Sequence, residues 1–160
     1  MLSIRPLVEE DNPTIAAVIR SVLLELGVPK VGTAYADPEL DFMTKAYDKP
    51  RAAYFVVEKE GDVIGGAGIS PLAGGKPTIC ELQKMYFLPK ARGFGIGEKM
   101  IHRCLQFARE NEFELCYLET LPYMEAAQKL YRKVGFDYID GPMGNTGHTT
   151  CNVWLTKSLL

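Results

Sequence analysis

The chain has 160 residues, of which 47% are hydrophobic and 24% are charged, and its formal net charge is −2. We expect one domain over residues 1–160, because a chain of this size can bury roughly two thirds of its unfolded surface. The composition argues against a disordered or fibrous protein. The eighteen basic residues are scattered among twenty acidic ones, so we expect no nucleic-acid partner.

The N-terminal stretch reaches a charged residue at Arg5, and no apolar run approaches the roughly 20 residues of a membrane span. We therefore expect neither a signal peptide nor a membrane anchor. The four cysteines form no CxxC pair. They are typical of small buried apolar residues, which favours a location in the reducing cytoplasm.

The first third of the chain predicts a strand, a helix and a loop. A short strand is expected at 3–7, followed by a helix whose apolar residues recur at helical spacing and which ends at Gly27. Residues 28–47 predict a loop, punctuated by Gly32, and then a short helix that Asp37 could cap.

The rest of the chain alternates strands and helices. Two β-rich runs in 52–70 predict a hairpin that turns near Gly61 and Asp62, and a further strand is expected at 79–88. The remaining elements are predicted from apolar periodicity as helices at 95–111 and 126–134 and strands at 114–120, 136–140 and 151–159. Strands that first pair in a hairpin and later alternate with helices predict a mixed sheet with helices packed on it.

The stretch RGFGIG at 92–97 places three glycines between an apolar run and a helix. Glycine permits positive φ and close approach of a ligand to the backbone, so a loop that opens a helix is a candidate anion site. A Walker phosphate loop is excluded because Glu98 follows Gly97, and the dinucleotide fingerprint is excluded because Met100 stands at its third glycine. A tight turn with no ligand is the remaining alternative.

The segment CELQKMYFLPKARGFGIGEKMIHRCLQFARE at 80–110 resembles the acetyl-CoA-binding segment of the GNAT family of N-acetyltransferases. Arg92, Gly95 and Gly97 fill the family pattern R/Q-x-x-G-x-G/A. LYRKVGF at 130–136 is similar to the family's L-Y-x-K-x-G-F stretch. The resemblance implies an α/β (α+β) fold with a mixed, mostly antiparallel sheet of about seven strands and about four helices packed on both faces.

The resemblance also implies acetyl-CoA as co-substrate and no metal. The pyrophosphate would lie on the glycine loop, and the pantetheine arm would lie beside the preceding strand where that strand splays from its neighbour. The expected cofactor-binding residues are Met85, Tyr86, Phe87, Arg92, Gly93, Phe94, Gly95, Ile96 and Gly97. For the three strand residues, a place in the core is the alternative.

Acetyl transfer to an amine needs a proton donor for the leaving thiolate and a base for the amine. The resemblance places Tyr131 near the thioester sulfur as the donor, although Tyr131 also lies on the apolar face of its helix. Glu81 and Glu119 each stand in an apolar strand, where burial would raise the pKa of a carboxyl group. Either could be the base, and a structural ion pair is the alternative for each. Regular alternation would place Glu81, Gln83, Met85 and Phe87 on one face.

Three features near the C-terminal half qualify the resemblance. Met124 stands where many family members carry an asparagine that can contact the cofactor. His148 and Cys151 are too few for a zinc site. The glycine-rich stretch 141–150 could fold over the acceptor pocket.

The sequence therefore predicts transfer of an acetyl group from acetyl-CoA to a primary amine, preferably that of a small polar metabolite, by direct attack. The alternatives are a non-catalytic acyl-CoA-binding sensor and an acetyltransferase of protein N-termini or lysines. The identity of the acceptor and the oligomeric state stay open, and a homodimer is the commonest assembly.

Overall fold

The computed structural model describes residues 1–31 and 34–160. Gly32, predicted to punctuate a loop, lies outside the described residues. The described residues form a seven-stranded sheet in the order β1-β2-β3-β4-β5-β7-β6, in which β4 and β5 are parallel and the other neighbours are antiparallel. The strands are β1 Leu2–Pro6, β2 Ala53–Lys59, β3 Asp62–Pro71, β4 Ile79–Phe87, β5 Leu115–Thr120, β6 Asp137–Ile139 and β7 Val153–Ser158.

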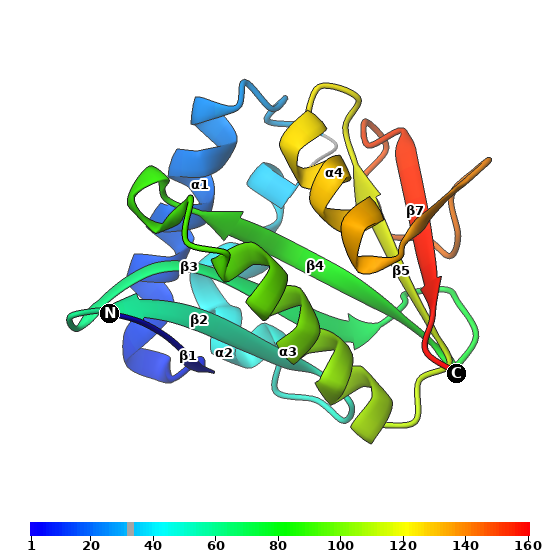
Figure 1. Ribbon diagram of the computed structural model, residues 1–160, viewed down its shortest axis with the longest axis horizontal. Coiled ribbons are helices and arrows are strands. Elements are labelled where there is room, and N and C mark those ends of the chain that lie inside the picture. The colour runs from blue at the N-terminus through cyan, green and yellow to red at the C-terminus, as the bar shows by residue number, and fades with distance from the viewer. Residues whose placement is uncertain (32–33) are drawn as a thin grey trace.

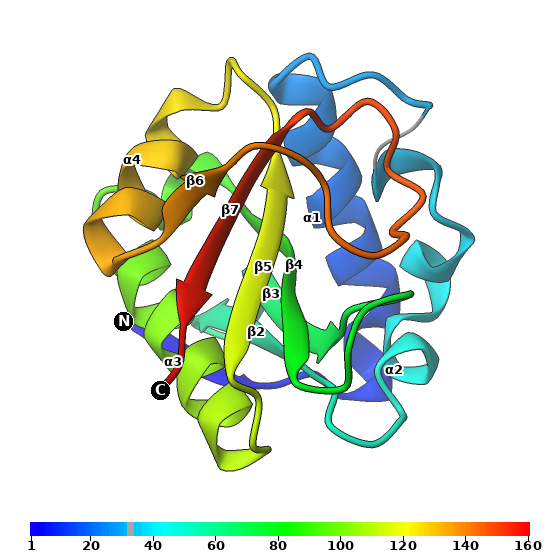
Figure 2. The ribbon, with the colours of Figure 1, turned by 90° about the vertical axis from the view of Figure 1, so that its right-hand side faces the viewer.

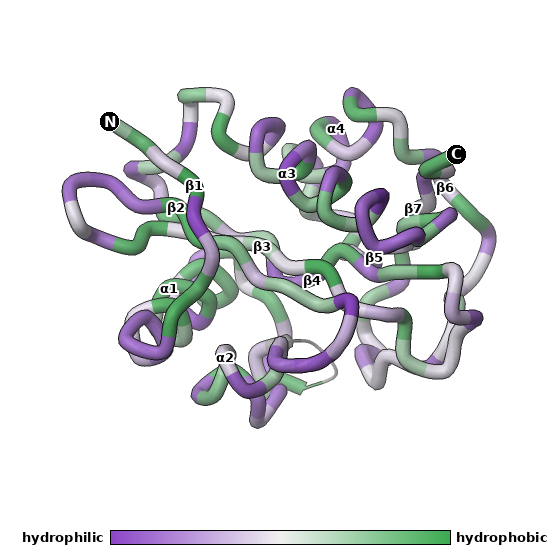
Figure 3. The backbone as a smooth tube through the Cα atoms, turned by 90° about the horizontal axis from the view of Figure 1, so that it is seen from below, coloured by the Kyte–Doolittle hydropathy of each residue, from purple (hydrophilic) through white to green (hydrophobic). Residues whose placement is uncertain are grey.

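Helices cover both faces of the sheet. α1 and α2 pack on one face, and α3 and α4 pack on the other (Figure 2). Figure 3 shows the same two helix layers on either side of the strands. The bounds are α1 Asn12–Glu25, α2 Met43–Ala46, α3 Ile96–Glu110 and α4 Glu125–Val134, and short 3-10 turns are η1 Glu9–Asp11, η2 Ala34–Ala36, η3 Pro38–Phe42 and η4 Pro89–Ala91. The predicted fold class is confirmed.

The local signals explain where the elements end. α1 ends before Gly27, whose φ of 70° suits glycine, and the hairpin between β2 and β3 turns at Glu60 and Gly61 with φ of 50° and 87°. Positive φ at both central residues is the hallmark of a type I′ turn, whose twist matches the flanking strands. The predicted helix and hairpin are both confirmed.

Two hydrophobic cores hold the layers together. Met100, Ile101 and Leu105 of α3 are fully buried against one face of the sheet, and α1 buries Ile15 and Ile19 against the other. Burying a side chain of this size contributes about 1.5–3 kcal/mol. The apolar periodicity that predicted both helices therefore marks the faces that attach them to the sheet. No helix in the described part of the chain is long and apolar enough to cross a membrane.

Strands β4 and β5 separate along their length. They pair only at Ile79 with Leu115, Cys80 with Cys116 and Glu81 with Tyr117, although β4 continues to Phe87 and β5 to Thr120. In Figure 1 the two strands converge near the C-terminus and diverge toward α4. The last residues of β4 thus keep their β3 partners but have none on β5.

A bulge in β4 corrects the predicted alternation of its side chains. Gln83 pairs with Gly68 and Tyr86 pairs with Gly66, so two residues of β4 oppose one of β3. Lys84 adopts a φ of 50° at this bulge. Because one extra residue reverses the faces that follow, Met85 packs in the core beneath α3 and Tyr86 in the core beneath α1. The prediction that Glu81, Gln83, Met85 and Phe87 share one face is wrong beyond the bulge.

Candidate active site

A cleft of about 550 Å³ occupies the space between the separating strands β4 and β5, the glycine loop and α4. This volume is in the usual range for ligand sites, roughly 300–1,000 Å³. Eight of the nine predicted cofactor residues line it, namely Met85, Tyr86, Phe87, Arg92, Gly93, Gly95, Ile96 and Gly97. The ninth, Phe94, lies outside the cleft lining with its side chain 64% exposed.

The glycine loop presents free amide groups at the start of α3. Gly93 and Gly95 have φ of 88° and 71°, and no atom lies within 4 Å of the place that a Cβ would take at either residue. The amide nitrogens from 93 to 98 make no hydrogen bond to any described residue. Together with the helix dipole, equivalent to about +0.5 charge, these donors favour an anion at this end of the cleft.

Tyr131 reaches the same cleft from α4. Its side chain is 7% exposed, lies edge-on to Phe136 with ring centroids 6.0 Å apart, and belongs to the core beneath α3. Burial raises the pKa of its phenol. No hydrogen bond of the hydroxyl is found within the described ranges. Tyr131 is therefore both a core residue and a neutral phenol at the edge of the cleft.

A second cavity, of about 50 Å³, lies on the α1 side of the same gap. Six residues line both cavities: Leu82, Lys84, Tyr86, Glu119, Thr120 and Met124. The smaller one also takes in Glu81, Gln83 and His148. The two cavities therefore share one wall. The large one is bordered by amide donors and the small one by carboxylates, so they are suited to hold two different reactants.

Glu81 is a buried carboxyl group in the smaller cavity. Its side chain is 5% exposed, and Oε1 accepts a hydrogen bond of 2.7 Å from Nε2 of Gln83. The Gln83 amide is in turn held by the hydroxyl of Tyr47 at 2.6 Å. Burial raises the pKa of Glu81 to about 7, with the hydrogen bond from Gln83 acting against the rise and the charge of Glu119 adding to it. Glu81 can therefore take up or release a proton near neutral pH.

Glu119 is held as a carboxylate. It accepts hydrogen bonds from the hydroxyls of Tyr117 at 2.7 Å and Thr146 at 2.6 Å, and Nδ1 of His148 lies 3.7 Å from its Oε1. Burial by itself raises the pKa of this group, but the three partners outweigh burial and lower it. The two strand carboxyl groups thus differ, and the expectation of a raised pKa holds for Glu81 alone.

His148 joins two parts of the chain over the smaller cavity. Nε2 lies 2.9 Å from Oδ2 of Asp37, and the side chain is 19% exposed. The hydrogen bond with Asp37, followed by the nearby carboxylate of Glu119, raises the pKa of His148 to about 9. Figure 2 shows the loop between β6 and β7 reaching toward the segment before α2. These contacts place His148 of the loop at the smaller cavity; that the loop covers the acceptor stays a prediction.

Comparison with known proteins identifies the family to which the chain belongs. Residues 16–136 match the acetyltransferase (GNAT) family. The chain belongs to this family. It is 47% identical over 156 residues to the uncharacterized N-acetyltransferase YjgM of Escherichia coli, covering 97% of this chain and 93% of that protein.

Solved structures of this family share the fold. A GNAT acetyltransferase from Staphylococcus aureus superposes with a TM-score of 0.89 at 19% identity, with full coverage of both chains. The acetyltransferase yncA from Salmonella typhimurium, solved with its cofactor acetyl-CoA, gives a TM-score of 0.79 at 18% identity, covering 99% of this chain and 94% of that one. The chain is thus an N-acetyltransferase with the GNAT fold.

Arg92, the first residue of the family motif, makes contacts that its motif position did not predict. Its guanidinium donates to the carbonyl of Phe87 at 2.8 and 3.1 Å and to both oxygens of Glu25 at 2.8 and 2.9 Å. These bonds link the glycine loop to the end of β4 and to the end of α1. Arg92 lines the cleft, but most of its donors are directed at the protein.

The last motif glycine, Gly97, has a packing role. A Cβ at this position would lie 2.7 Å from Cδ2 of Leu130 and 3.8 Å from Cε2 of Phe87. Because that first distance is shorter than real Cβ contacts, a side chain here would force the Leu130 side chain to move. Gly97 therefore leaves the space that Leu130 of α4 occupies against the start of α3.

Met124, the departure from the family pattern, caps α4 without a polar side chain. It occupies the N-cap position with no side-chain hydrogen bond to the helix, and its Sδ lies 3.3 Å from Oγ1 of Thr120. Met124 lines both cavities. An apolar, flexible side chain thus stands where a polar cofactor contact was expected.

Lys84 and Asp37 are site residues whose roles the sequence did not indicate. Nζ of Lys84 lies 2.6 Å from Oε1 of Glu39 and 3.6 Å from Oδ2 of Asp37, and its side chain is 3% exposed. Asp37 does occupy the predicted cap position before η3, but it makes no capping bond there. It contacts His148 and Lys84 instead. The sequence signal that could have indicated the role of Lys84 was the presence of a lysine within an apolar strand.

Proposed function

We propose that this N-acetyltransferase transfers the acetyl group of acetyl-CoA to a primary amine of a small polar metabolite by direct attack of the amine on the thioester. The observation that carries the proposal is the shared wall between the cleft beside the glycine loop and the small cavity that contains Glu81, Glu119 and His148. When bound, acetyl-CoA supplies an activated acyl group whose leaving group is a thiolate.

The cleft fits acetyl-CoA in two respects. The free amides from 93 to 98 and the start of α3 suit the pyrophosphate. The residues of β4 beyond Glu81 have no β5 partner, so their backbone groups on that side, apart from the Phe87 carbonyl that Arg92 holds, are available to an extended pantetheine arm. Met85, Tyr86 and Phe87 flank this arm, and the complex of Salmonella yncA with acetyl-CoA supports the choice of cofactor.

Glu81 is the general base in this proposal. A base works best when its pKa lies near the working pH, and the pKa of Glu81 is about 7. Glu119 is a poorer base because its pKa is lowered and its oxygens already accept two hydroxyl hydrogen bonds. Glu119 instead attracts the ammonium group of the acceptor and holds the loop that contains Thr146.

Tyr131 is the general acid. Its hydroxyl, on the cleft wall and free of hydrogen bonds to described residues, donates a proton to the thiolate as the C–S bond breaks. Burial keeps the phenol protonated before the transfer. The same low-polarity surroundings disfavour a free thiolate, whose ordinary pKa is about 8.5, and so assist the transfer.

A thiol-release assay tests this function. Purified protein with acetyl-CoA should release coenzyme A only when a primary amine is added, and mass spectrometry should find that amine heavier by one acetyl group. Binding of acetyl-CoA with no amine-dependent release would support a sensor instead. Acetylation of peptide N-termini or lysines in preference to every small amine would support a protein acetyltransferase.

A further inference from the structure

We infer that the acceptor is an unbranched aliphatic primary amine, R–CH2–NH3⁺, with no carboxylate beside the amine. The inference rests on the proposed function and deepens it, because the small cavity bordered by Glu81 and Glu119 is taken as the acceptor pocket. Two independent observations carry it: the charges that surround this pocket and its size.

The first observation is that every cation at the pocket is already paired. Among the described lining residues, the basic side chains are Lys84 and His148. Lys84 is held by Glu39 at 2.6 Å, with Asp37 at 3.6 Å, and His148 lies between Asp37 and Glu119. An incoming carboxylate would therefore meet no uncommitted cation.

One carboxylate oxygen at the pocket is free to accept a hydrogen bond. Glu81 is 5% exposed, and its Oε1 accepts from Gln83 while its Oε2 has no hydrogen-bond partner in the described part of the chain. This oxygen is not among the fully buried unpaired atoms of the described residues, so it is open to the pocket and can accept from an incoming donor. An ammonium group supplies up to three N–H donors and a positive charge. A carboxylate in the same place would bring two negative oxygens close to Glu81 and Glu119.

The second observation is the volume of about 50 Å³. About 10–15 Å³ of such volume holds one water molecule, so the pocket has room for an amine nitrogen and a narrow alkyl chain. Its other walls are the apolar side chains of Val28, Leu121 and Met124. We therefore expect a methylene beside the nitrogen to fit better than a branched carbon, which brings one more substituent against these walls.

Three acceptors of similar length separate charge from shape. n-Pentylamine is unbranched and carries no carboxylate, 2-aminohexane adds a methyl branch beside the amine, and norleucine replaces that methyl by a carboxylate. We expect kcat/KM to fall about tenfold or more from pentylamine to 2-aminohexane, as for one ill-fitting methyl group. A further fall of about tenfold or more is expected for norleucine, because its carboxylate meets like charges.

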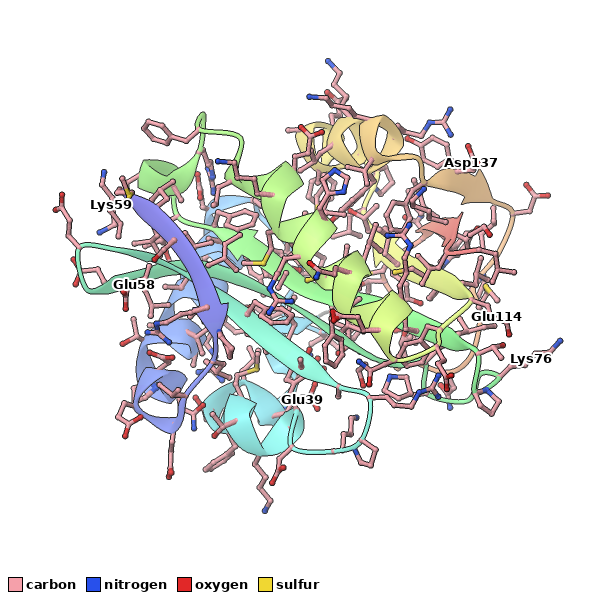
Figure 4. The ribbon with its side chains drawn as sticks, turned by 60° about the horizontal axis from the view of Figure 1, so that its bottom comes forward. Glu39, Glu58, Lys59, Lys76, Glu114 and Asp137 are labelled. Carbon is pink, nitrogen blue, oxygen red and sulfur yellow. The ribbon has the colours of Figure 1, made fainter. Side chains whose placement is uncertain are left out.

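Glu39 provides the charge-specific test. Glu39→Gln removes the nearer partner of Lys84 and leaves Asp37 at 3.6 Å, so a carboxylate can compete for the ammonium of Lys84. The activity with norleucine relative to 2-aminohexane should rise about fivefold or more. Glu114→Gln is the matched control, because Glu114 is an exposed glutamate at the start of β5, remote from Glu39 beside α2 (Figure 4). This control should leave the ratio unchanged.

The outcomes separate this inference from the function on which it rests. Norleucine turned over as fast as pentylamine, or an unchanged ratio in Glu39→Gln, would overturn the inference while amine acetylation stands. Release of coenzyme A that no amine increases, in protein that binds acetyl-CoA, would overturn the proposed function and the inference with it.

Discussion

Asp37 and His148 are separated by 111 residues in the sequence, yet Oδ2 of Asp37 lies 2.9 Å from Nε2 of His148. The pair joins the segment before α2 to the loop between β6 and β7. On the inner side, His148 also faces Glu119, whose Oε1 accepts from Thr146 of the same loop. The acceptor side of the molecule is therefore closed by polar contacts, and its stability should depend on pH.

The first prediction concerns this pair. In Asp37→Asn the main cause of the raised pKa of His148 is removed, so the pKa should fall from about 9 toward 6.5. Because the folded pKa is above the unfolded one, the pair stabilises the protein fully below about pH 6.5, and this contribution is lost as the pH rises through 9. At about 1.4 kcal/mol for each pKa unit, the contribution is at most about 3.5 kcal/mol.

Urea unfolding and NMR titration of the His148 ring measure both effects. The free energy of unfolding of wild type should exceed that of Asp37→Asn most at pH 6, and the difference should shrink by pH 9.5. Asp48→Asn, at an exposed aspartate, serves as the control. A difference that stays constant across this pH range would show that Asp37 acts without the charge of His148.

The second prediction concerns the leaving group. Tyr131→Phe keeps the ring packed against Phe136 and removes the hydroxyl, so kcat should fall about 10²-fold. The affinity for coenzyme A and the free energy of unfolding should change little, because the hydroxyl has no hydrogen bond to described residues. Steady-state kinetics and calorimetry give these three quantities. Wild-type turnover in this variant would leave Tyr131 with a packing role alone.

Most of the fold could be predicted because its signals are local. Apolar residues at helical spacing attach α1 and α3 to the sheet, and the turn at Glu60 and Gly61 needs only its own two residues. The separation of β4 from β5 followed from the family resemblance rather than from periodicity, and the pairing that stops at Glu81 agrees with it.

The site was predictable only in part, because several of its contacts join distant segments. The bulge at Lys84 arises from pairing with β3, and it moves Lys84 next to Glu39 and Asp37. Nothing in the local sequence indicates such a bulge. The bonds from Arg92 to Glu25 likewise join residues 67 apart, so a motif position alone could not show them.

The third prediction concerns the glycine loop. Gly95→Asp places a carboxylate where the amides from 93 to 98 are expected to bind pyrophosphate, so coenzyme A binding should become undetectable by calorimetry. The fold should survive, because no atom lies within 4 Å of the new Cβ and aspartate tolerates the φ of 71° better than most residues. Gly95→Asn is the matched control, since it has nearly the same shape without the charge. Equal affinity in wild type and in folded Gly95→Asp would remove this loop from the cofactor site.

The last prediction concerns Glu81 and has two readouts. If Glu81 is the base, kcat/KM in wild type should rise with pH through an acidic limb near pH 7, the pKa of this carboxyl group. Glu81→Gln cannot accept the proton, so the limb should disappear and activity should fall. Glu119→Gln should keep an acidic limb, moved to lower pH, because Glu81 still sets it but loses the charge of Glu119 that helps to raise its pKa.

The second readout of Glu81→Gln is the free energy of unfolding. We expect this substitution to raise the free energy of unfolding, whereas Asp37→Asn should lower it. A buried carboxyl group whose folded pKa lies above its ordinary 4.5 destabilises the native state as the pH rises from about 4.5 to 7. Glu81→Gln should therefore be more stable than wild type at pH 8, by up to about 3.5 kcal/mol, and close to it at pH 4.5. Loss of activity together with this gain in stability identifies a group held at the site for chemistry rather than for folding. A glutamine variant that is less stable than wild type at pH 8 would instead mean that Glu81 serves the fold as a carboxylate, and the base would have to be sought among Glu119 and His148.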